Sequence, residues 1–209
     1  MFREVWRWGV KKGFIRSSLD VPFDDHNFIE DEKVKRDTWE LNEWKEFLDR
    51  ESDWYALEQN SEDQDRVWES FVAHQLIRIC ACSGLRPKEW SLLKWKDVKD
   101  YPNEDSIDEE DKLAIEMKIH PSTKTGQREA YSTGGIYFQN IYEKTKFKGK
   151  NDWIFADLEG KRLEPDWFSD IFNGSGKCNG LMDFTDQYKL TGKHLVPYCL
   201  RHFYASQSI

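Results

Sequence analysis

The sequence lacks any apolar run that approaches the roughly 18 residues required to cross a membrane. Its first residues, Met1 to Arg7, also lack the apolar core of a secretory signal peptide. We therefore expect no membrane partner and a cytoplasmic location.

Cysteine is scarce, and no two cysteines form a C-x-x-C pair. The four are Cys80, Cys82, Cys178 and Cys199. This usage favours reduced thiols over disulfide bridges or a zinc site. The histidines His26, His74, His120 and His194 form no ligand pair at helical spacing. The sequence thus predicts no structural metal.

Recognisable nucleotide-binding and calcium-binding motifs are also missing. Residues 173–178 partly resemble a phosphate-binding loop, but that motif needs a glycine where Asp170 stands and a serine or threonine where Cys178 stands. A flexible loop is the favoured interpretation. The acidic run at 104–111 lacks the glycine and the ligand spacing of a calcium loop. We expect no cofactor.

Positive charge is in deficit, because 31 basic residues stand against 39 acidic ones and give a formal net charge of −8. Binding to a phosphate backbone calls for a basic face, so the overall charge argues against a nucleic-acid partner. The acidic residues gather, however, in two runs, at 24–32 and 104–111. Such runs are usually solvated loops, and they leave room for a basic face elsewhere.

Enough apolar material is present for a folded protein, since 38% of the residues are hydrophobic and 15% aromatic. Residues 1–15 carry an apolar stripe at helical spacing, and Gly13 can end that helix. We interpret residues 1–15 as the last helix of an upstream domain, 16–36 as a linker and 37–209 as the main domain. A first helix docked on the main domain is an equally open alternative.

The main domain is predicted to be mainly α-helical with a small antiparallel β-sheet. A helix is expected from Thr38, with Asp37 and Glu40 as its capping box. Residues 62–82 predict a second helix, which the pair Ser83-Gly84 would end, and Pro87 fits the first turn of a third. Further helices are expected at about 135–147, at 165–172 and from 195 to the end. Alternation at Ile115–His120 predicts a strand, which a turn at 123–127 would connect to a partner strand at Arg128–Ser132.

Three cations fall in constrained settings. Arg86 follows a glycine turn and opens a helix, Lys124 lies in the hairpin turn, and Arg201 stands among apolar and aromatic residues. An arginine in an apolar stretch needs an anionic partner, either a carboxylate or a phosphate. Each residue also has a purely structural interpretation on its own; Arg86, for example, can simply pair with Glu89 one turn further on.

Taken together, the segments around these cations resemble the tyrosine recombinases of the phage-integrase family. Ser83-Gly84-Leu85-Arg86-Pro87-Lys88-Glu89 is similar to the family's first arginine box, Thr123-Lys124-Thr125-Gly126 to its hairpin lysine motif, and Leu200-Arg201-His202-Phe203-Tyr204 to its second arginine box. The resemblance covers about residues 38 to 209. It implies the family's catalytic-domain fold for this region, and residues 1–15 resemble the last helix of the family's core-binding domain.

The resemblance also implies roles. Arg86 and Arg201 would clamp the scissile phosphate, Lys124 would act as general acid, Glu89 would orient Arg86, and His202 would support packing. Contacts to DNA are expected from a further set: Lys88, His120, Thr123 and Thr125. The implied partners are double-stranded DNA and further copies of the complete protein in a tetramer. The implied setting is the cytoplasm, for a protein encoded by a bacterium or a phage.

One position departs from the family pattern. The family usually carries a histidine three residues before the second arginine, where this sequence has Tyr198. A phenol is a poor base at neutral pH but can donate a hydrogen bond to a phosphate oxygen. We expect Tyr198 to contact the phosphate and the nucleophilic tyrosine to lie beyond Ile209, so that this chain binds DNA without cleaving it.

Two other hypotheses remain open. One is a non-catalytic DNA-binding or regulatory relative of the recombinases. The other is a helical scaffold with coincidental motifs, which predicts that Arg86, Lys124 and Arg201 lie far apart.

Overall fold

The computed structural model describes Trp8 and residues 10–14, 37–99, 114–124, 126–174 and 180–207. The chain divides into two units, Met1–Lys35 and Arg36–Ile209. Three predicted segments lie wholly outside the described residues: the linker at 16–36, the acidic run at 104–111 and Thr125. Most of residues 1–15 and most of the loop at 173–178 also lie outside them. The assignment of residues 1–36 to an upstream domain and a linker therefore remains a prediction.

Helix α2 (Leu41–Glu58) begins later than the sequence predicted. Its capping box is formed by Glu40 and Glu43, not by Asp37 and Glu40. The physical reason lies in Trp39, which is buried and donates its indole N–H to Gln187 at 3.0 Å. That contact holds the preceding segment out of the helix, and Asp37 accepts the backbone N–H of His194 instead.

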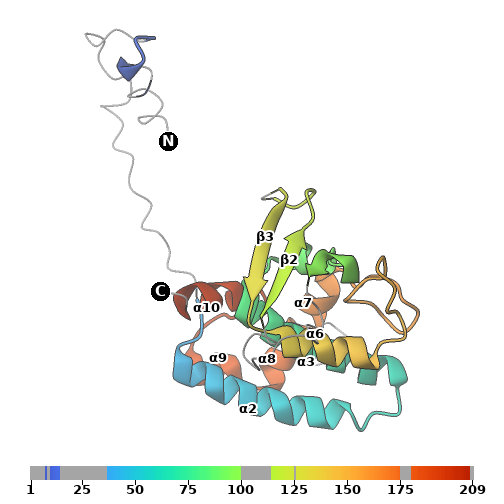
Figure 1. Ribbon diagram of the computed structural model, residues 1–209. Helices are drawn as coiled ribbons and strands as arrows, with labels where there is room; N and C mark the ends of the chain where they lie inside the picture. The colour runs from blue at the N-terminus through green and yellow to red at the C-terminus, as the bar shows by residue number, and fades with distance from the viewer. Residues whose placement is uncertain are drawn as a thin grey trace. The chain divides into compact units, whose positions relative to one another are not determined.

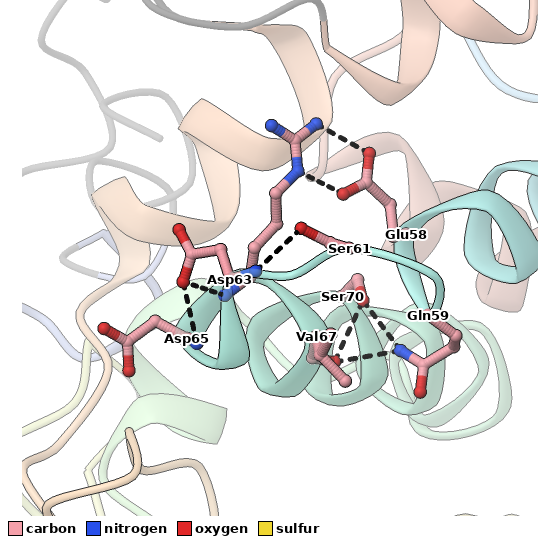
Figure 2. Close-up of polar contacts among 8 residues, drawn as sticks. Glu58, Gln59, Ser61, Asp63, Asp65, Val67 and Ser70 are labelled. Carbon is pink, nitrogen blue, oxygen red and sulfur yellow. Dashed lines mark hydrogen bonds and ion pairs between the residues drawn. The ribbon is translucent and has the colours of Figure 1, made fainter.

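Helix α3 (Gln64–Ser83) is bounded by the signals that the sequence contains. Asp63 accepts two backbone N–H groups at its start, and Gly84 ends it in the left-handed conformation. Figure 2 shows the turn between α2 and α3, where the Gln59 amide donates to the Val67 carbonyl and to the Ser70 hydroxyl. These contacts join the end of α2 to the first turns of α3 and satisfy the Gln59 amide.

The predicted hairpin is present as β2 (Ile115–Ile119) and β3 (Arg128–Ser132), which pair antiparallel with Ile119 opposite Arg128. A short strand that was not predicted, β1 (Val98–Lys99), adds to β2 and gives the order β1-β2-β3. The apolar side chains of β2 and Ala130 of β3 are buried, as the alternation predicted. The hairpin projects from the helical body (Figure 1).

The remaining helices pack on α3 or on one another: α3 contacts α2, α6, α10 and β3, and α7 contacts α4 and α8. They are α4 (Pro87–Ser91), the 3-10 turn η1 (Trp95–Asp97), α6 (Gly135–Lys144), α7 (Pro165–Asn173), α8 (Leu181–Phe184), α9 (Gln187–Thr191) and α10 (Cys199–Gln207). The last helix begins at Cys199 and not at 195, α6 ends at Lys144 and not at 147, and α8 and α9 were not predicted. The prediction of a mainly α fold with a small antiparallel sheet is confirmed.

Aromatic side chains make up much of the core that joins these elements. Trp39 and Phe47 at the start of the domain pack against Phe172 of α7, and Trp44 packs against Phe203 of α10. This packing fixes α10, which carries Arg201, against the amino-terminal end of the domain. Among the described helices, none combines the length and the apolarity that a membrane crossing needs.

Candidate active site

The site is built around the turn that follows α3. Gly84 has a φ of +61°, and a Cβ at this position would lie 2.5 Å from the Tyr204 ring of α10. The turn therefore needs glycine for its backbone conformation and for the close approach of Tyr204. Its carbonyl oxygen accepts a hydrogen bond from Nη1 of Arg201. One backbone group thus joins the second arginine box to the first.

Arg86 is the N-cap residue of α4, two residues after that carbonyl. Glu89, in the first turn of α4, is fully buried and accepts the Arg86 backbone N–H at 2.9 Å and Nη1 of Arg86 at 2.9 Å. It also accepts Nη2 of Arg128 from β3 at 2.8 Å. A single buried carboxylate therefore orients two arginines that come from different elements.

The electrostatics follow from these contacts. Burial raises the pKa of Glu89, but the hydrogen bonds from the Arg86 backbone and from Arg128 and Arg86 outweigh it, so the pKa lies below the ordinary value. The hydrogen bond to Glu89 raises the pKa of Arg86, and a hydrogen bond with Tyr198 acts in the same direction. Glu89 and Arg86 are therefore both charged at neutral pH.

Tyr198 lies just before α10 and is hydrogen-bonded to Arg86, and His202 lies in the first turn of α10. Their rings are 5.1 Å apart in an edge-to-face arrangement. His202 is half-buried in this packing. The fold thus brings five of the predicted residues to one region: Arg86, Glu89, Tyr198, Arg201 and His202.

The hairpin carries the other predicted residues. Lys124 and His120 are exposed in the turn, where Nδ1 of His120 lies 2.8 Å from the Ser122 hydroxyl. Thr123 is buried and donates to the Gly126 carbonyl, so its hydroxyl serves the turn itself. Lys88 is exposed on α4, and Thr125 lies outside the described residues.

Arg128 connects the hairpin to the arginine cluster. It is the first residue of β3, directly after the turn that carries Lys124, and its ion pair with Glu89 anchors that end of the hairpin to α4. A cavity of about 310 Å³ lies beside this contact and is lined by Gly84, Arg128, Glu129, Arg201 and Tyr204, among others. Arg128 and Arg201 therefore border one space that is large enough for a phosphate.

Sequence reasoning did not assign Arg128 to the site. The available signal was Glu89, because a carboxylate beside the apolar residues Trp90, Leu92 and Leu93 must be paired and hydrogen-bonded if it is buried. The second partner comes from a strand, and only the hairpin register brings it there.

The described residues contain no group of three or more histidine, cysteine or acidic side chains arranged to hold a metal. Cys80 and Cys82 form no disulfide, and burial raises the pKa of both. These two thiols are therefore protonated and poor ligands at neutral pH.

Comparisons with known proteins identify the fold. No protein-family model and no curated protein sequence matches the chain. Among solved structures, XerA recombinase matches with a TM-score of 0.53 at 13% identity, over 100% of this chain and 68% of that one. The Tn1549 transposon integrase in complex with transposon right-end DNA matches with a TM-score of 0.51 at 17% identity, over 98% of this chain and 62% of that one.

XerH recombinase bound to its difH substrate in a pre-cleavage complex matches with a TM-score of 0.51 at 14% identity, over 98% of this chain and 52% of that one. The chain thus spans between about half and two thirds of the length of these three structures. The expectation of a tyrosine-recombinase catalytic-domain fold is confirmed.

Proposed function

We propose that this chain, which has the fold of a tyrosine-recombinase catalytic domain, holds a DNA phosphate for strand cleavage and rejoining. In the complete protein the reaction would pass through a 3′-phosphotyrosine. The observation that carries the proposal is the convergence of Arg86 and Arg201 on the Gly84 turn, with Tyr198 hydrogen-bonded to Arg86. The Tn1549 integrase and XerH, which share the fold, were both solved with DNA.

The chemistry fits two fixed arginines. Attack on a phosphodiester places negative charge on the non-bridging oxygens, so cations held in position stabilise the transition state without reorganising. In our proposal Arg86 and Arg201 form this clamp. Glu89 keeps Arg86 in orientation, and Tyr198 donates a hydrogen bond to a phosphate oxygen, which a phenol can do at neutral pH.

Lys124 is proposed as the general acid that protonates the departing 5′ oxygen. The position of the turn supports this role, because the Arg128–Glu89 ion pair ties the turn end of the hairpin to the helix that Arg86 opens. Lys88, His120, Thr123 and Thr125 are proposed as flanking DNA contacts. His202 would support the packing of Tyr198 beside Arg86.

The nucleophile is proposed to lie outside residues 1–209. Tyr204 is a poor candidate, because its ring packs over Gly84 and a Cβ on that glycine would meet it at 2.5 Å. Tyr198 is already engaged with Arg86. The complete protein would assemble as a tetramer on double-stranded DNA.

A second candidate function is a non-catalytic DNA-binding relative. Two observations favour it: tyrosine in place of the usual histidine at position 198, and the net charge of −8. The two candidates differ in whether the complete protein forms a covalent bond with DNA.

The test uses the complete protein and a nicked duplex that releases a short fragment after cleavage, so that the covalent complex accumulates. Arg86→Ala and Arg201→Ala should abolish the covalent complex and leave much of the duplex binding, because the clamp acts on one phosphate. Arg50→Ala is the matched control, since Arg50 pairs with Glu46 on the surface of α2. Wild-type cleavage by either clamp variant would refute the assignment.

A further inference from the structure

Away from the arginine cluster, lysines are concentrated in two segments of this acidic protein that lie side by side. From the last residue of α6 to position 150, four lysines alternate with uncharged residues. Two more lysines lie at positions 94 and 96, at η1. We call the set the lysine surface: Lys94, Lys96, Lys144, Lys146, Lys148 and Lys150. All except Lys94 are exposed. In Figure 1 the connection between α6 and α7 lies at the opposite end of the domain from α10.

Backbone hydrogen bonds hold the two lysine-bearing segments together. The Lys96 N–H donates to the Lys150 carbonyl at 2.9 Å, and the Trp95 N–H donates to the Asp152 carbonyl at 3.3 Å. The Trp95 indole donates to the Phe147 carbonyl at 2.9 Å. The lysines are therefore carried on a fixed backbone, which lowers the entropy lost when a partner binds.

Trp153 lies at the centre of this arrangement. Nζ of Lys94 lies 4.1 Å from the centroid of its ring, and the Arg162 guanidinium lies 5.3 Å from the same centroid. Cation–π attraction holds Lys94 in place without neutralising it, since the ring carries no charge, whereas Arg162 is also paired with Glu164.

Two carboxylates that neighbour the lysines in sequence accept backbone N–H groups. Asp97 accepts the Lys94 backbone N–H at 3.0 Å, and Asp152 accepts the Gly149 backbone N–H at 2.8 Å. Lys96 donates to the neutral Asn151 side chain, and Lys148 donates to a backbone carbonyl. Within the described ranges no lysine of the surface forms an ion pair. The surface therefore presents positive charge that a polyanion can neutralise.

We propose that the lysine surface binds the phosphate backbone of duplex DNA, at a place separate from the phosphate held by Arg86 and Arg201. The inference rests on the proposed function for the identity of the polyanion. The contacts are to phosphates and carry no sequence information, so this surface holds flanking DNA in position.

The experiment measures binding of the 209-residue chain to a fluorescein-labelled 30-base-pair duplex of arbitrary sequence by anisotropy, over a series of NaCl concentrations. The test variant is Lys148→Gln/Lys150→Gln. The control is Lys45→Gln/Lys189→Gln, which removes the same charge from exposed positions on α2 and α9. All four side chains are exposed, so the thermal unfolding midpoints should match the wild type.

Each phosphate contact contributes about 0.9 to the slope of log affinity against log salt, so the test variant should lose about 1.8 from the slope. At 0.1 M salt this corresponds to roughly 60-fold weaker binding. The control should retain the wild-type slope. Equal slopes for the two double variants would overturn the proposal, and so would failure of the wild-type chain to bind the duplex.

Two further outcomes separate this inference from its alternatives. Full duplex binding by Lys148→Gln/Lys150→Gln, together with loss of binding to poly-glutamate, would assign the surface to an acidic protein and overturn a DNA role. Loss of the covalent complex in Arg201→Ala, with an unchanged salt slope in the lysine variant, would leave the proposed function standing and refute only the lysine surface.

Discussion

Replacing Glu89 with glutamine tests whether one buried carboxylate organises the arginine cluster. The substitution keeps the shape of the side chain but removes the charge that Arg86 and Arg128 share. A glutamine side chain keeps only one of the two carboxylate oxygens, and its NH₂ group would take the place of the other. Because Arg86 Nη1 and Arg128 Nη2 bind different oxygens, one of the two arginine side chains would face a donor and lose its acceptor.

The magnitude follows from burial. Breaking a fully buried ion pair costs about 3–5 kcal/mol. Here the arginine side chains are 23% and 31% exposed, so solvent recovers part of that loss. We expect a loss of about 2–3 kcal/mol in the free energy of unfolding, which for a chain of this size lowers the melting temperature by about 5–10 °C.

The assay is urea unfolding at pH 7, followed by circular dichroism, with Glu46→Gln as the control. Glu46 also pairs with an arginine, but Glu46 is 52% exposed and Arg50 38% exposed, so that pair contributes only about 0–1 kcal/mol. Duplex binding is measured in parallel. Equal destabilisation by the two variants would refute the reasoning that Glu89 is the organising charge.

Three other predictions follow from the same region. Gly84→Ala should lower the free energy of unfolding by about 2–4 kcal/mol, because it adds a collision with Tyr204 to the strain of a positive φ. The control Gly192→Ala, at a φ of +67° with nothing within 4 Å, should lower it by about 1–2 kcal/mol through the strain alone. Equal losses of stability in thermal unfolding would contradict the Tyr204 contact. Because the pKa of Glu89 is lowered in the folded protein, its contribution to stability is present above the unfolded pKa of about 4.3 and is lost as pH falls through the folded pKa. In urea titrations at decreasing pH, Glu89→Gln should therefore lose less free energy of unfolding than the wild type. The same pH dependence of stability in both proteins would contradict this assignment. Lys124→Ala in the complete protein should slow cleavage by about 10²–10⁴-fold. DNA with sulfur as the 5′ leaving atom should restore the rate of this variant, since a thiolate leaves without a proton. A rate that stays low on this DNA would exclude the general-acid role.

The sequence predicted those elements whose signals are local. Gly84 and Pro87 mark the end of α3 and the start of α4, and the two-residue alternation marks β2. The short helices α8 and α9 carry too few residues for a helical period to emerge. Tertiary contacts define them, among them the hydrogen bond between Trp39 and Gln187, which also delays the start of α2.

The candidate site divides in the same way. Arg86 and Glu89 lie one turn apart on one helix, so their pairing was one of the alternatives that the sequence offered. The contact of Arg201 with the Gly84 carbonyl and that of Arg128 with Glu89 join residues from distant parts of the chain. Both depend on how α10 and the hairpin pack on the rest of the fold, which no local pattern encodes.

The most direct test of the central claim is to trap the complete protein on nicked DNA and identify the residue linked to it. Our account predicts a 3′-phosphotyrosine at a tyrosine other than Tyr198 and Tyr204, formed by the wild type and the Arg50→Ala control but not by Arg201→Ala. A link through Tyr198 or Tyr204, or a complete protein that binds DNA and forms no covalent bond, would contradict it.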